Sequence, residues 1–139
     1  MAEVSENARR LAEVGQRFNT NIPAILAGEE IEVPDIYSPD LVLTNFEPSP
    51  FPGTYRGYEG LYEWTRDLMT DFDDGRVDLL EFSESGDEIA TKLKFTGTGH
   101  RSGIETSLVW GALWRFRNGL IVEVNGYPSY EEALERLSG

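Results

Sequence analysis

The second half of the sequence is a series of β-type segments separated by short turns, and it limits the fold more than any other feature. The four segments span residues 76–127 and alternate in polarity or are rich in β-branched and aromatic residues: RVDLLEFSE, EIATKLKFTGTG, IETSLVWGALWRF and LIVEVNGY. SGD and RNG between them are hairpin turn signals. The pattern predicts an antiparallel meander. A short helix is expected after it, where Ser129 and Glu132 have the spacing of a capping box.

The first half of the sequence has helical periodicity instead. Apolar residues recur every three to four positions and predict helices over residues 3–18 and 58–72. Proline and glycine at its ends suggest a short second helix over residues 23–28. LVLTNF, residues 41–46, predicts a strand, and the proline-rich loop over residues 47–57 is expected to lack regular structure.

The length and charge of the chain limit the classes of function. With 139 residues it is expected to form a single domain, residues 1–139. Asp and Glu number 25 against 12 Lys and Arg, so the net charge of −13 disfavours nucleic acid and anionic membranes as partners. There is no cysteine, and one histidine cannot build a multi-histidine zinc site. A carboxylate-only Mg²⁺ or Ca²⁺ site is the open alternative, but no pattern in the sequence supports it, so no metal is expected. The lack of a long apolar run predicts a cytoplasmic protein.

The glycine-rich stretch FTGTGHRSGIETS, residues 95–107, does not fit a phosphate-binding loop. Ser102 stands where a dinucleotide fingerprint needs its third glycine, and a strand rather than a helix follows. We therefore expect a hairpin and no cofactor. His100, the only histidine, is either an exposed turn residue or a proton carrier near the mouth of a pocket.

The order of these segments resembles the SnoaL-like branch of the NTF2-like superfamily. The residues that carry the resemblance are G-x-x-G at 57–60, the turn at 102–103, R-x-G-x-I at 117–121, Tyr127, and the Ala-Leu pair at 133–134. The resemblance implies an α+β cone, in which a curved, mostly antiparallel mixed sheet wraps around N-terminal helices and encloses an apolar pocket. Relatives include ketosteroid isomerase, polyketide cyclases and limonene epoxide hydrolase, so the reaction must be argued from the site.

The resemblance to ketosteroid isomerase does not carry over its catalytic residues. It places the general base near Asn45 and the protonated carboxyl group near Val109. An amide cannot act as that base and valine cannot donate a hydrogen bond. The candidate catalytic residues are Glu105 and His100, which would move protons, and Asn45, which would polarise a carbonyl or ether oxygen. Burial in an apolar cavity would raise the pKa of a glutamate toward neutrality. For Glu105 the alternative is an exposed position at the end of the hairpin.

The remaining candidates would contact a small apolar organic ligand. Residues expected to line or gate the pocket are Trp64, Tyr55, Tyr58, Tyr37, Phe95, Val109 and Asn125. The strand over residues 104–116 has two faces, and two arguments disagree about which one points inward. Its apolar content predicts that the face with Trp110 and Trp114 contacts the core, whereas the resemblance predicts that the face with Val109 does. We favour the second arrangement, which leaves Trp110 and Trp114 on the convex face and predicts a homodimer through them.

Two hypotheses about function follow from the sequence. The first is a protein that binds a cyclic, polyketide-, steroid- or terpene-like molecule, with or without cofactor-independent acid/base catalysis. The second is a non-catalytic dimeric module whose pocket is structural. A ligand that binds the folded state alone would raise the melting temperature and support the first hypothesis.

Overall fold

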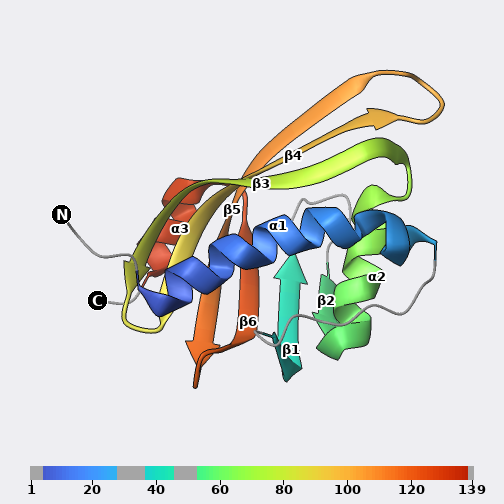
Figure 1. The fold of residues 1–139 in the computed structure, drawn as a ribbon. Helices are drawn as coiled ribbons and strands as arrows, with labels where there is room; N and C mark the ends of the chain where they lie inside the picture. Colours follow the sequence, from blue (N-terminus) through green and yellow to red (C-terminus); the bar gives the residue numbers. More distant parts are fainter. Residues whose placement is uncertain (1–4, 28–36, 46–52, 138–139) are drawn as a thin grey trace.

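The computed structural model describes residues 5–27, 37–45 and 53–137. In order along the chain, the elements are α1 (Glu6–Leu26), β1 (Tyr37–Asn45), β2 (Gly53–Arg56), α2 (Gly57–Met69), β3 (Phe72–Ser85), β4 (Glu88–Gly99), β5 (Glu105–Arg117), β6 (Leu120–Tyr127) and α3 (Tyr130–Arg136). Figure 1 shows α1 lying across one face of the sheet, with α2 beside β2. None of the described helices is long and apolar enough to cross a membrane.

The six described strands form one mixed sheet in the order β2-β1-β6-β5-β4-β3. β1 pairs with β6 in parallel, and every other pairing is antiparallel. Registers shift within β3 and between Arg115 and Phe116 of β5, and such bulges bend a sheet and increase its twist. The predicted meander, β3 to β6, is confirmed, as is the α+β class with a curved sheet around helices.

The N-terminal helix is longer than expected. α1 continues through Pro23 to Leu26, so the prediction of a separate helix starting at Pro23 is wrong, and residue 28 lies outside the described residues. Proline removes one backbone donor, but Pro23 is exposed, so the freed carbonyl can be hydrated. Ser5 caps the start of α1 by accepting a hydrogen bond from the Ala8 amide at 3.0 Å.

The proline-rich loop is only partly described, and its end is regular. Residues 53–56 form β2 and pair with β1, although no strand was expected there. Residues 46–52 lie outside the described part. β2 ends where α2 begins, and this short connection holds α2 against β1.

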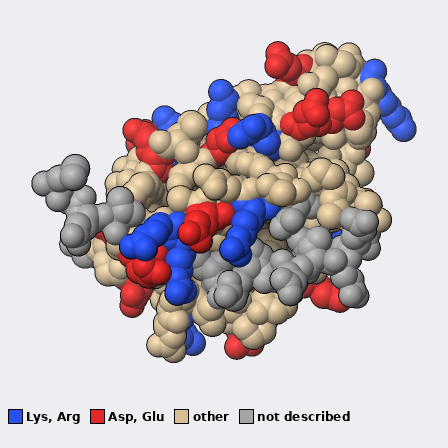
Figure 2. Space-filling view, viewed as in Figure 1, with Lys and Arg blue, Asp and Glu red and all other residues tan. Residues whose placement is uncertain are grey.

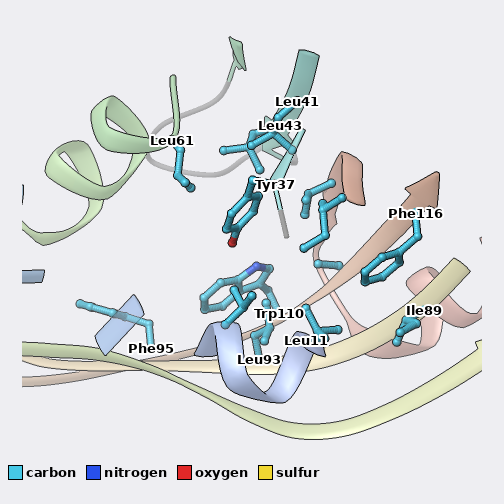
Figure 3. Packing of buried hydrophobic residues seen from close by; sticks show 14 of the residues in the cluster. Leu11, Tyr37, Leu41, Leu43, Leu61, Ile89, Leu93, Phe95, Trp110 and Phe116 are labelled. Atoms are coloured by element: carbon cyan, nitrogen blue, oxygen red, sulfur yellow. The ribbon is translucent and has the colours of Figure 1, made fainter. Parts of the chain in front are cut away.

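The two faces of the sheet bury different clusters. On the inner face, α1 and α2 cover a core that includes Leu11, Leu93 and Phe116, part of which is shown in Figure 3. On the outer face, α3 packs Ala133 against Ala90 and Leu113. Side chains of a strand alternate between faces, so these contacts fix which residues of β4 and β5 face the helices.

The strand β5 presents its tryptophans to the inner face. Trp110 is 7% exposed and belongs to the core, while Val109 is 42% exposed. The expected inward position of Val109, and the convex position of Trp110 and Trp114, are therefore wrong. The resemblance gave a register one residue out, and a shift of one residue exchanges the two faces. The apolar content of β5 indicates the correct face, because burial of the large indole rings is the larger gain.

Charged residues are mixed on the surface that carries α1. Figure 2 shows Lys and Arg beside Asp and Glu on this face, without a large area of a single sign. At the start of α1, Glu6 pairs with Arg9 at 3.4 Å and with Arg10 at 3.2 Å.

Candidate functional site: an apolar cavity under the first helix

A cavity of about 90 Å³ lies between α1, α2 and the inner face of the sheet. Its walls are apolar for the most part, because the amphipathic stripes of both helices point into it. The described lining residues are Leu11, Val14, Gly15, Phe18, Tyr37, Leu43, Thr44, Asn45, Leu61, Trp64, Val77, Leu79, Thr91, Leu93, Trp110, Ala112, Trp114, Val124 and Gly126. A concave, mostly apolar space with a few polar groups is the usual form of a small-molecule site.

Tyr37 brings a hydroxyl group into this cavity. The residue begins β1 and is 6% exposed, and its ring extends from β1 toward Trp110 with the oxygen leading (Figure 3). Within the described residues, the phenolic oxygen has no hydrogen-bond partner. Every fully buried side-chain oxygen of the described residues has a hydrogen-bond partner. Because the Tyr37 oxygen has none, it is not fully buried and must reach the open space of the cavity.

Burial decides the protonation state of this phenol. Desolvation disfavours the phenolate and raises the pKa of Tyr37 well above its ordinary value. The hydroxyl therefore stays protonated at neutral pH and acts as a hydrogen-bond donor. Of the described lining residues, Tyr37 is the only one with an ionisable side chain.

Asn45 and Trp64 form the second polar point of the cavity. The indole Nε1 of Trp64, on α2, donates to Oδ1 of Asn45, at the end of β1, at 2.8 Å. Trp64 also packs against Phe18 of α1, with ring centroids 5.8 Å apart. The hydrogen bond orients the Asn45 amide and joins α2 to β1 at the cavity wall.

The floor of the cavity contains a hydrogen-bonded pair in the sheet. Trp114 donates from Nε1 to Oγ1 of Thr91 at 2.9 Å, and Thr91 donates to the carbonyl of Ala112 at 3.3 Å. Thr91 is fully buried. Both polar groups are thereby satisfied, so this part of the floor presents aromatic surface to a ligand.

Three further candidates lie near the cavity but do not line its described wall. Phe95 is 2% exposed and packs edge-on against Phe72 in the core. Tyr55 donates to Oδ2 of Asp67 at 2.7 Å, and burial, followed by this hydrogen bond, raises the pKa of Tyr55 to about 12. Tyr58 is 37% exposed and donates to the backbone carbonyl of Tyr37 at 3.1 Å, which supports the start of β1.

The expected proton carriers lie away from the cavity. Glu105 is exposed at the start of β5, beyond the part of the strand that lines the cavity. His100 lies in the turn before it, where Nδ1 is 2.5 Å from Asp73 Oδ1 and Nε2 donates to the carbonyl of Thr70 at 2.8 Å. Both ring nitrogens are thus directed at the α2–β3 connection, and neither faces the cavity.

Two more candidates face outward. Val109 lies on the outer face of β5, on the same side as Leu113. Asn125 lies between the inner-facing Val124 and Gly126, and its Nδ2 donates to Glu123 at 2.6 Å. The expected inward positions of Val109 and Asn125 are therefore wrong.

The contribution of α1 to the cavity wall was not predicted from the sequence. Leu11, Val14 and Phe18 lie on the apolar stripe of α1, and all three line the cavity. Gly15 is the residue from which the cavity could have been predicted. A glycine within the apolar stripe of a helix has no side chain to fill the space beside it. Among the described residues, no group of three His, Asp or Glu side chains is placed to hold a metal ion.

Comparison with solved structures confirms the fold. An NTF2-like protein of unknown function from Burkholderia pseudomallei K96243 is 24% identical, with a TM-score of 0.69 over 98% of this chain and 100% of that one. TerC, co-crystallised with polyporic acid, is 23% identical, with a TM-score of 0.67 over 96% and 98%. A protein with a ketosteroid isomerase-like fold from Catenulispora acidiphila DSM 44928, in complex with trimethylamine, is 16% identical, with a TM-score of 0.66 over 98% and 96%.

Comparison of the sequences gives the family. No curated protein sequence matches the chain significantly. The model of the SnoaL-like domain matches residues 17–124. This range includes strands β1 to β5 and most residues of the cavity wall. The chain belongs to the SnoaL-like domain family.

Proposed function

We propose that this protein binds a small, neutral and largely apolar organic molecule in the cavity under α1. The observation that carries the proposal is the Tyr37 hydroxyl, which faces an apolar cavity without a hydrogen-bond partner among the described residues. A buried polar group without a partner is unfavourable, so an acceptor on a ligand would supply what the protein lacks. A carbonyl or ether oxygen fits this position.

The charge of the lining favours a neutral ligand. No Asp, Glu, Lys, Arg or His side chain occurs among the described lining residues. Burying an ionised group without an opposite charge is strongly unfavourable. A molecule with a compact apolar body and one uncharged acceptor therefore fits better than an organic acid or amine in its ionised form.

The described geometry supports binding more than acid/base catalysis. Glu105 and His100 cannot transfer protons to a molecule in this cavity from where they lie. Burial raises the pKa of Tyr37, so its phenol stays protonated at neutral pH and supplies no phenolate to act as a base. Tyr37 can polarise a carbonyl group by donating to its oxygen. If the protein has a reaction, this hydrogen bond is its electrophilic contribution.

Two structural relatives support a ligand-binding role in a general way. TerC was co-crystallised with polyporic acid, and the protein from Catenulispora acidiphila was in complex with trimethylamine. Both molecules are small and organic. At 16–23% identity these relatives share the fold with this chain, so the ligand must be found by experiment.

The test is a thermal-shift screen of the purified protein against steroids, polyketide-like aromatics, terpenes and epoxides. A matched pair, 2-acetonaphthone and 2-ethylnaphthalene, adds ligands that differ in the ketone oxygen alone. A bound ligand raises the melting temperature in proportion to occupancy and affinity. We expect the ketone to raise it more than the hydrocarbon; no shift with any compound would contradict the proposal.

Homodimerisation is a separate proposal, and it cannot use the residues first expected. Trp110 and Trp114 line the cavity and are not available on the outer face. That face carries Arg115, which pairs with Glu88 at 3.2 Å and Glu123 at 3.4 Å. Sedimentation equilibrium would test association, and a monomer at micromolar concentration would contradict it.

A further inference from the structure

Gly15 lies in the middle of the 21-residue helix α1, on the side that lines the cavity. Glycine is less favourable than alanine within a helix, because it loses more backbone freedom on folding. A methyl group added at Gly15 would meet no atom of the described residues within 4 Å. Packing within the described part of the chain therefore does not require glycine at this position.

Gly60 of α2, by contrast, is a position where the packing does require glycine. A methyl group on Gly60 would lie 2.8 Å from the carbonyl carbon of Tyr55, so the approach of β2 to α2 excludes a side chain there. Among the described residues, Gly15 has no such neighbour, and it lines the cavity.

Hydrogen bonds join α1 to the sheet on both sides of Gly15 and oppose its movement toward the sheet. On one side, Arg10 donates from Nη1 to the carbonyl of Gly119 in the β5–β6 turn at 3.0 Å. On the other side, Asn19 donates to the carbonyl of Val77 at 2.8 Å and accepts from the Val77 amide at 2.9 Å. These contacts fix the height of α1 above the sheet.

We propose that Gly15 is a size-determining residue, which keeps the cavity wide enough for a ring system to lie between the backbone of α1 and the tryptophan floor. The inference rests on the proposed function, because it assigns the position of the ligand body in the same cavity. In a cavity of about 90 Å³, a methyl group added to the wall takes space that a ligand would otherwise occupy.

The test compares Gly15→Ala with Gln16→Ala, an exposed position on the same helical turn. Two ketones of different width serve as probes: acetophenone, with one ring, and 2-acetonaphthone, with two. Affinities are measured by quenching of tryptophan fluorescence, and melting temperatures without ligand are measured in parallel. Gly15→Leu, which adds a longer side chain in the same direction, gives a second variant.

We expect Gly15→Ala to raise the melting temperature by roughly 2–6 °C, because alanine is the better helix former and its methyl enters open space. It should weaken binding of 2-acetonaphthone at least tenfold and of acetophenone less than threefold. Gly15→Leu should prevent binding of both ketones. Gln16→Ala should leave both affinities unchanged.

The outcomes separate the two claims. If the wild-type protein binds the ketones and Gly15→Ala binds them equally well, the role of Gly15 is wrong and the proposed function stands. A lower melting temperature in Gly15→Ala would also contradict the role, since it would show that the space is not open. If the wild-type protein binds neither ketone nor any compound of the screen, the proposed function fails and the role of Gly15 fails with it.

Discussion

Replacing Tyr37 with phenylalanine should have opposite effects on stability and on binding. Tyr37 is 6% exposed, and its hydroxyl has no hydrogen-bond partner among the described residues. Tyr37→Phe therefore removes a polar group and breaks no described side-chain hydrogen bond. The free energy of unfolding should stay the same or rise by up to about 1 kcal/mol.

Binding of a ligand with an acceptor should weaken in the same variant. A neutral hydrogen bond contributes about 0.5–1.5 kcal/mol. At about 1.4 kcal/mol per tenfold change in Kd, 2-acetonaphthone should bind Tyr37→Phe about 2- to 12-fold more weakly. The affinity for 2-ethylnaphthalene, which has no acceptor, should not fall.

Urea denaturation and ligand titration on the same preparations measure both effects. Tyr58→Phe is the matched control, because the Tyr58 hydroxyl donates to the backbone carbonyl of Tyr37 at 3.1 Å and is outside the described cavity lining. It should lower stability by about 1 kcal/mol or less and leave both affinities unchanged. A loss of more than about 1 kcal/mol in Tyr37→Phe would refute the reasoning, since it would mean that the hydroxyl already has a partner.

Three other predictions follow from the same geometry. Thr91→Val should lower the free energy of unfolding by about 1–3 kcal/mol in urea titrations, because it leaves the indole N–H of Trp114 without its acceptor; an unchanged midpoint would contradict the described floor. Glu105→Gln should leave ketone affinity unchanged in fluorescence titrations, since the side chain is exposed and away from the cavity, and a tenfold loss would place it in the site after all. Burial raises the pKa of Tyr37 and raises that of Tyr55 to about 12, so the folded state holds both protons more tightly than the unfolded state. Stability should therefore be unaffected below about pH 10, the ordinary pKa of tyrosine, and should fall as the pH rises toward 12; a flat urea midpoint over this range would contradict the burial of the phenols.

The meander and its turns could be predicted from the sequence because their signals are local. Alternation places β3 to β6 within a few residues, and the RNG turn appears as Asn118 and Gly119, both with positive φ. Ser129 caps the start of α3 by accepting a hydrogen bond from the Glu132 amide at 3.2 Å. The short strand β2 could not be predicted, because its pairing with β1 is a tertiary contact that composition does not encode.

The site was harder to predict than the fold, because it depends on which face of each strand is turned inward. Asn45, Trp64 and Tyr37 line the cavity as expected, whereas Val109 and Asn125 face outward. A shift of one residue in register exchanges the two faces of a strand, and a resemblance between distant sequences does not fix register to one residue. The apolar pattern of β5 predicts its inward face correctly, whereas the resemblance does not.

The most direct test of a ligand site in this cavity is an NMR measurement of intermolecular NOEs between 2-acetonaphthone and the protein. The account predicts contacts from the ketone methyl group to the ring of Tyr37, and from the naphthalene protons to Trp110 and the α protons of Gly15. Contacts to outward-facing residues such as Val109, without any to Tyr37 or Trp110, would show that the molecule binds elsewhere and would contradict the account.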